Sequence, residues 1–166
     1  MIDWLHFAEK GIWLGFAAVG FAILFNVPVR TLWIIFIVGA LGGLTKAFIM
    51  SFDHSVIMAS FAGATAVGVL SVFASHSKHS PALVFAIPSV IPMVPGVFSY
   101  KTMLGLIRLA GNTTTDDFST IINETVNNGL KALFILLTLA IGVALPLLIT
   151  RKESTKDLLF VKKEET

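Results

Sequence analysis

The sequence contains no cysteine and few charged residues. Without cysteine, neither a disulfide framework nor a thiolate metal site is available. Charged residues make up only 13% of the 166 residues, against about 25% in soluble domains. The formal net charge of +2 is too small to indicate a nucleic-acid partner. Together with a hydrophobic content of 55%, these scarcities predict an integral membrane protein in a lipid bilayer.

Motifs of enzymes are also missing. The chain has no Gly-x-Ser-x-Gly elbow and no Walker-type phosphate loop, so we expect no direct coupling to ATP. His76 and His79 flank Lys78, but no carboxylate or cysteine is near enough in sequence to complete a metal site. A solvated loop is the simpler interpretation. We therefore expect a protein that is not an enzyme and holds no cofactor or metal.

Apolar segments of spanning length dominate the chain, since about 20 residues cross a bilayer. Five of them cover about residues 11–27, 31–50, 56–75, 82–110 and 130–149. This pattern predicts an all-α integral membrane protein with about five transmembrane helices. We expect a single membrane domain over residues 1–150, followed by a charged cytoplasmic tail over residues 151–166.

The one long connection has a pattern of its own. In residues 116–133, apolar side chains recur at helical spacing with asparagines and a glutamate opposite them. We predict a short amphipathic helix that lies in the membrane interface and runs into the fifth span. A plain transition from loop to helix, packed on the bundle, is the alternative.

Lysine and arginine in short loops predict the orientation. Arg30, Lys78 and the basic residues of the tail share one side of a five-span arrangement. The count favours an outside N-terminus and a cytoplasmic C-terminus in a bacterial inner membrane. If residues 82–110 re-enter the membrane instead of spanning it, the N-terminus moves to the cytoplasmic side.

Three prolines and a glycine interrupt the fourth apolar segment at Pro88, Pro92, Pro95 and Gly96. Proline lacks an N–H and clashes with the carbonyl four residues earlier, so the carbonyls of Val84, Pro88 and Ile91 should be freed. Unsatisfied backbone costs several kcal/mol in hydrocarbon and survives only inside protein or beside a water-filled cavity. The segment therefore predicts a pathway through the membrane. A kinked span whose carbonyls are met by neighbouring serine or threonine is the alternative.

A half-helix that starts after this break would present free N–H groups and a positive dipole end. Ser99, Tyr100 and Lys101 follow within about two turns. Helix N-terminus, hydroxyls and ammonium together suit a carboxylate, and the freed carbonyls suit an ammonium or a cation. We predict a site for a zwitterionic or carboxylate solute.

Other polar residues lie near span ends. Asn26, Pro28 and Arg30 form a turn after the first span, in which Pro28 would end the helix and Asn26 would bond the freed carbonyls. Arg30 fits a topology anchor or a gating contact. Lys46 fits snorkelling to the interface as well as it fits a functional role. Lysine at 101 and arginine at 108, seven residues apart, share a helix face.

Two of these segments carry a resemblance. Residues 20–30, Gly-Phe-Ala-Ile-Leu-Phe-Asn-Val-Pro-Val-Arg, resemble the first signature of the threonine/serine exporter family. Residues 88–96, Pro-Ser-Val-Ile-Pro-Met-Val-Pro-Gly, followed by Tyr100, resemble the second. The order, separation and five-span layout are similar to the small, YjjB-type half of that family. The resemblance covers most of residues 10–150.

The resemblance implies a function and a partner. Family members are built from two related membrane halves, and the larger half carries an extra cytosolic domain that this chain lacks. A larger partner chain, and proton-driven export of small amino acids such as threonine and serine, or of a dicarboxylate such as succinate, are implied. Since no aspartate or glutamate lies deep in any span, a proton carrier would come from the partner.

Two alternatives stay open beside this reading. One is a membrane scaffold that stabilises a partner without transporting a solute. The other is an integral-membrane enzyme, which would need a cluster of polar catalytic groups at one depth, and the sequence offers none. An oligomer of this chain alone also stays open.

Overall fold

The computed structural model describes residues 4–78, 80–111 and 115–150. In chain order these form α1 (Trp4–Leu24), α2 (Val29–Met50), α3 (Val56–Lys78), α4 (Ala82–Val90), the 3₁₀ turn η1 (Ile91–Met93), α5 (Gly96–Ala110) and α6 (Thr115–Thr150). No strand occurs in the described ranges. The predicted all-α fold is confirmed. The expected tail, residues 151–166, lies outside the described residues.

The helices account for the predicted spans. Four helices, α1, α2, α3 and α6, are long and apolar enough to cross a membrane. The fourth predicted span is a bent pair: Ala82–Met93 and Gly96–Ala110 meet at 54°. Counting this pair as one span gives five. The protein is therefore a multi-pass membrane protein. We call the bent pair, which is either one span with a break or a re-entrant loop, the broken span.

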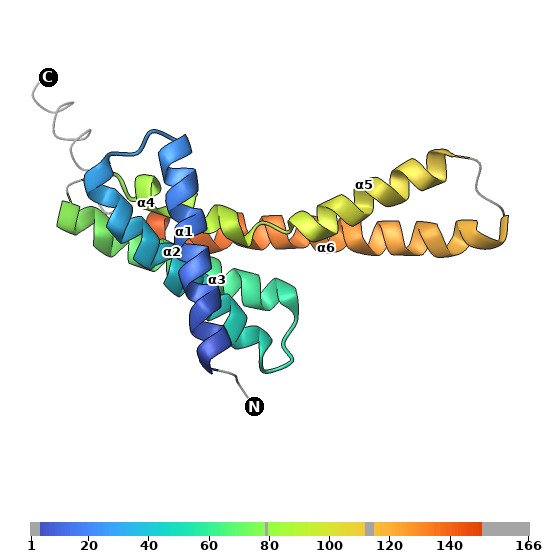
Figure 1. Ribbon diagram of the computed structural model, residues 1–166, viewed down its shortest axis with the longest axis horizontal. Helices are drawn as coiled ribbons and strands as arrows, with labels where there is room; N and C mark the ends of the chain where they lie inside the picture. The colour runs from blue at the N-terminus through green and yellow to red at the C-terminus, as the bar shows by residue number, and fades with distance from the viewer. Residues whose placement is uncertain (1–3, 79, 112–114, 151–166) are drawn as a thin grey trace, which may run out of the picture.

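Close approaches between helices hold the bundle together (Figure 1). The helix α2 packs between α1 and α3, and α3 packs along the C-terminal part of α6. At the α3–α6 contact, a Cβ built on Gly142 would lie 2.9 Å from the Phe61 carbonyl oxygen, and one on Gly68 would lie 2.9 Å from that of Val143. Small residues allow such contacts between backbones in a membrane, where helices gain little from burying apolar surface.

The core forms around α4. In one cluster Phe85 packs with Ile35 and Ala18, and in the other Ala86 packs with Val67 and further apolar side chains of α2, α3 and α6. Because α4 has neighbours in α1, α2 and α3, its position at the start of the broken span is fixed by packing.

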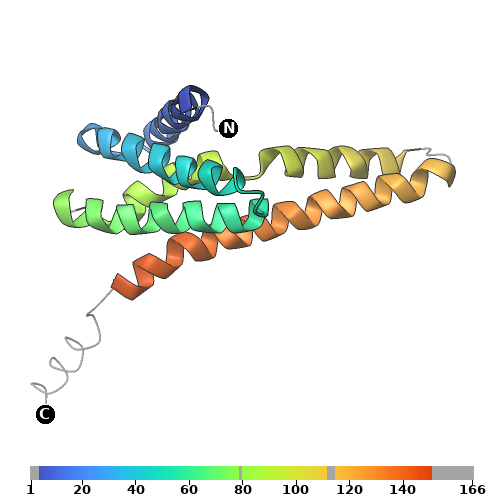
Figure 2. The same ribbon diagram turned by 90° about the horizontal axis from the view of Figure 1, so that it is seen from below.

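Beyond this bundle, α5 and the first part of α6 run side by side (Figures 1 and 2). We call this pair, Gly96–Ala110 with residues 115–133, the arm. The residues predicted as an interfacial helix are indeed helical, but they belong to α6, which continues for 36 residues without a break and pairs with α5. At 1.5 Å per residue α6 is about 54 Å long, against about 30 Å for the hydrocarbon core. Even a tilt of about 40° leaves part of it outside the hydrocarbon.

Candidate functional site

The broken span is the centre of the candidate site. Pro88 lies inside α4 and is fully buried, Pro92 lies in η1, and Pro95 directly precedes α5. Val94 is extended, with ψ of 138°, so the helical path stops there and begins again at Gly96. Each proline sits where its missing N–H interrupts a helix or opens one. The predicted break is therefore present.

Short-range bonds satisfy part of the backbone at the break. The N–H of Val94 donates to the Ile91 carbonyl at 3.0 Å, and that of Gly96 donates to the Val94 carbonyl at 2.8 Å. The Pro95 carbonyl accepts from Ser99 twice, from its N–H at 3.0 Å and its hydroxyl at 3.1 Å. The hydroxyl of Ser99 thus serves the first turn of α5.

The Met93 carbonyl is satisfied from another helix. Lys46 of α2 donates its Nζ to this oxygen at 3.1 Å, across 47 residues of sequence. The helix α3 also closes on this point, since a Cβ built on Gly63 would overlap the Met93 methyl group and lie 3.0 Å from the Lys46 Cβ. The sequence left two interpretations of Lys46 open, snorkelling to the interface and a functional role. In the structure its ammonium bonds the backbone at the break.

Lys101 of α5, the cation that the sequence predicted at the site, does not lie at the break. Lys101 and Arg108 do share one face, and that face lines a polar groove of the arm, a cavity of about 420 Å³ between α5 and α6. Side chains of α6 complete this groove: Glu124, Thr125, Asn127, Asn128 and Lys131. Tyr100 is 67% exposed, and Gly96 has open space where a Cβ would be. The structure thus brings Lys46, and not Lys101, to a carbonyl of the break.

The turn between α1 and α2 closes with backbone bonds. Asn26 adopts the left-handed conformation, with φ of 54°. The Val27 N–H donates to the Ala22 carbonyl and the Asn26 N–H to the Ile23 carbonyl, both at 3.0 Å. This pattern is a Schellman motif, in which asparagine is one of the few residues that fit. The prediction had the Asn26 side chain in this role. Pro28 precedes α2, and Arg30 is exposed in its first turn.

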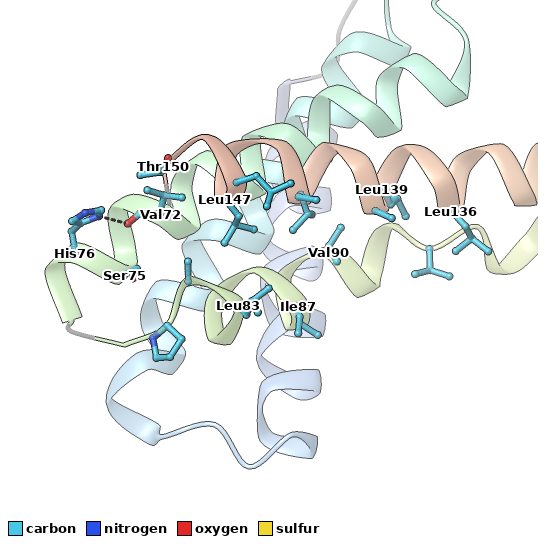
Figure 3. A pocket seen from close by; sticks show the side chains of 17 residues that line it. Val72, Ser75, His76, Leu83, Ile87, Val90, Leu136, Leu139, Leu147 and Thr150 are labelled. Carbon is cyan, nitrogen blue, oxygen red and sulfur yellow. Dashed lines mark hydrogen bonds between the residues drawn. The ribbon is translucent and has the colours of Figure 1, made fainter. Parts of the chain in front are cut away.

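An apolar groove lies on another side of the broken span (Figure 3). It is a cavity of about 720 Å³ between α3, α4 and α6. Val90 and Val94, next to the break, line it together with Leu136 and Leu139 of α6. Its polar groups gather at the end formed by Ser75, His76 and Thr150, where the His76 ring nitrogen Nδ1 is 2.8 Å from the Val72 carbonyl oxygen (Figure 3).

Buried hydroxyls were the alternative partners for the freed carbonyls. Ser89, in α4 itself, donates to the Ile35 carbonyl of α2 at 3.4 Å. Ser60 and Ser71 of α3 are fully buried, and within the part of the chain that the structure describes their hydroxyls have no hydrogen-bond partner. Buried hydroxyls without a partner are uncommon and call for an explanation.

A comparison with family models decides the class of protein. The model described as "Threonine/Serine exporter, ThrE" matches residues 10–149, which include both the turn at Asn26 and the break. The chain belongs to the threonine/serine exporter family. The resemblance inferred from the two signatures is thereby confirmed, and membership supports a role in export across a membrane.

One relative of this exporter-family chain is a protein of Haemophilus influenzae, named only as an uncharacterized protein. It is 31% identical over 129 residues, which are 78% of this chain and 42% of the relative. The chain thus spans less than half the length of the curated relative it matches. No solved structure matches it significantly.

Proposed function

We propose that this chain is one membrane subunit of a secondary exporter of small amino acids such as threonine and serine, or of a related small carboxylate. It works with a larger partner chain in the bacterial inner membrane, with its C-terminus in the cytoplasm. The observation that carries the proposal is the broken fourth span in a chain of the exporter family, with a Lys46 ammonium on its free carbonyl.

The solute passes the break in this proposal. Pro88, Pro92, Pro95 and Gly96 interrupt the helix within the fourth span, and helix ends of this kind bind the charged groups of solutes in other transporters. Two further groups, Tyr100 and Lys101, lie one to two turns along α5, within the arm, where we place the mouth of the pathway. The Asn26–Arg30 turn acts at the other end as a topology anchor or gating contact.

The apolar groove is where we place the partner. Its lining offers little to a zwitterion, because a polar solute would lose its hydration there without gaining hydrogen bonds. An apolar transmembrane helix suits the same surface. The greater length of the Haemophilus relative, of which this chain matches 42%, supports the idea that further protein accompanies this fold.

A scaffold without transport is the second candidate. The apolar groove and the exposed apolar side chains of the arm, among them Met103, Ile107 and Val126, favour a chain that binds other proteins. A scaffold of this kind would need neither an intact break nor Lys46.

An efflux assay with loaded cells distinguishes the exporter subunit from the scaffold. Cells that lack both subunits are supplied with this chain, the partner, or both, and the loss of threonine, serine and succinate is followed. We expect export with both chains only, and the solute that leaves fastest identifies the substrate class. Full efflux with this chain alone would contradict the two-subunit proposal, and undiminished efflux from the partner alone would favour the scaffold.

A further inference from the structure

Lys46 brings its ammonium to the break, and no described side chain gives it a counter-ion. Within the described ranges its one hydrogen-bond acceptor is the neutral Met93 carbonyl, and no carboxylate lies within ion-pair distance. A lysine ammonium has three donors. Lys46 lies four residues before the end of α2 at Met50, and charged side chains inside a span are costly and usually have a function.

None of the carboxylate side chains that the structure describes forms an ion pair with Lys46. Glu9 in α1 is exposed, and it accepts from Trp13 at 3.4 Å and pairs with His6. Glu124 lines the polar groove of the arm. Asp53 lies in the loop between α2 and α3. A carboxylate for Lys46 therefore has to come from outside the described part of the chain.

We propose that Lys46 recognises the carboxylate of the transported solute. This inference rests on the proposed export function and adds the residue that selects the solute. When a solute enters, the Lys46 ammonium exchanges the Met93 carbonyl for the solute carboxylate. Charge-assisted hydrogen bonds are roughly twice as strong as neutral ones, so the exchange is favourable.

The exchange releases an acceptor for the other charge of the solute. An amino acid has an ammonium group, and the Met93 carbonyl, freed from Lys46, accepts from it. The helix α5 begins at Gly96, three residues after Met93. The positive end of its dipole adds to the attraction for the carboxylate. One bond inside the protein is thus replaced by two bonds to a zwitterion, which favours zwitterions over simple amines.

Ser60 of α3 is a further polar group close in sequence to this contact. It lies three residues before Gly63, where α3 closes on Lys46 and Met93, and residues at this spacing are neighbours on a helix surface. Its hydroxyl is fully buried and has no partner among the described residues. A solute that carries polar groups would give this hydroxyl a partner.

The test compares solutes with and without a carboxylate. The full chain and its partner are reconstituted in vesicles of phosphatidylethanolamine and phosphatidylglycerol that are preloaded with threonine. Uptake of labelled threonine by exchange is then measured against two competitors, unlabelled threonine and threonine methyl ester. Lys46→Gln is the main variant, because glutamine still donates to the Met93 carbonyl but has no charge. Lys46→Arg keeps the charge, and Lys10→Gln, at an exposed position of α1, is the matched control.

We expect Lys46→Gln to weaken threonine competition about ten- to hundredfold, the effect of losing a hydrogen bond to a charged group. Competition by the methyl ester should stay unchanged, Lys46→Arg should recover most of the threonine affinity, and Lys10→Gln should behave like the unaltered protein. Equal weakening of both competitors, or no change in either, would overturn the role of Lys46. If the unaltered pair exchanges none of the solutes, the export function itself fails, and this outcome is distinct from both.

Discussion

Gly105 of α5 lies directly against Thr125 of α6, so closely that a Cβ at residue 105 would overlap the threonine hydroxyl. That hydroxyl donates to the Ile121 carbonyl at 2.7 Å, which keeps the threonine side chain in place. A second contact of this kind lies farther along the arm, where a Cβ on Gly129 would be 3.3 Å from the Thr102 methyl group. The arm is held together by these two close approaches.

Gly105→Val should therefore loosen the arm. The added side chain meets Thr125 and forces the helices apart, at a cost of about 1–3 kcal/mol for overpacking. Thermal unfolding of the purified chain in detergent should show a lower midpoint. Gly96→Ala is the control, because a Cβ there meets nothing within 4 Å. Equal midpoints for the two variants would contradict the packing of the arm.

Asn26→Ala should destabilise the turn between α1 and α2. Alanine pays about 1–2 kcal/mol to adopt the left-handed conformation, and Asn26→Gly adopts it freely. The alanine variant should unfold at a lower temperature than both the glycine variant and the unaltered chain. If glycine is as harmful as alanine, the asparagine side chain has a role beyond backbone conformation, such as the gating contact proposed for this turn.

The orientation is open to cysteine labelling, because the chain has no cysteine of its own. Asp53→Cys, in the loop between α2 and α3, should react with a membrane-impermeant maleimide in intact cells. Lys78→Cys, at the end of α3, should react only after the cells are opened. The reverse pattern would contradict the proposed topology: either the C-terminus lies outside the cytoplasm, or residues 82–110 re-enter the membrane and the N-terminus is cytoplasmic.

Filling the apolar groove should displace the partner. In Ala140→Trp the indole occupies the space between α4 and α6, so the partner helix cannot enter. We expect less partner to co-purify with the variant, while the variant itself reaches the membrane in normal amounts. Ile23→Trp, on an exposed face of α1, is the control. Normal co-purification with Ala140→Trp would mean that the groove is not the partner's site.

The broken span could be predicted because its cause is local. Pro88, Pro92 and Pro95 interrupt a helix by their own covalent structure, whatever surrounds them. The spans could be predicted for a similar reason, since their length follows from the bilayer. The turn at Asn26 was also predicted. The backbone bonds that close it were not predicted, because they require the left-handed conformation that Asn26 adopts.

Contacts between distant segments could not be predicted in this way. Lys46 and Met93 are 47 residues apart, and their bond depends on how α2, α3 and η1 pack around Gly63. The signal available in the sequence was chemical: a lysine inside one apolar span and freed carbonyls in another are complementary. The course of residues 116–133 was ambiguous for a different reason, because the same apolar stripe suits a membrane interface and a packing face against α5.

The helix α6 is continuous from the bundle to the far end of the arm. Its C-terminal part is held against α3 by the close backbone contacts at Gly68 and Gly142. The far end belongs to the arm, beyond the other helices. Because the helix has no break, a movement of the arm would be carried to the wall of the apolar groove and to the break beside it.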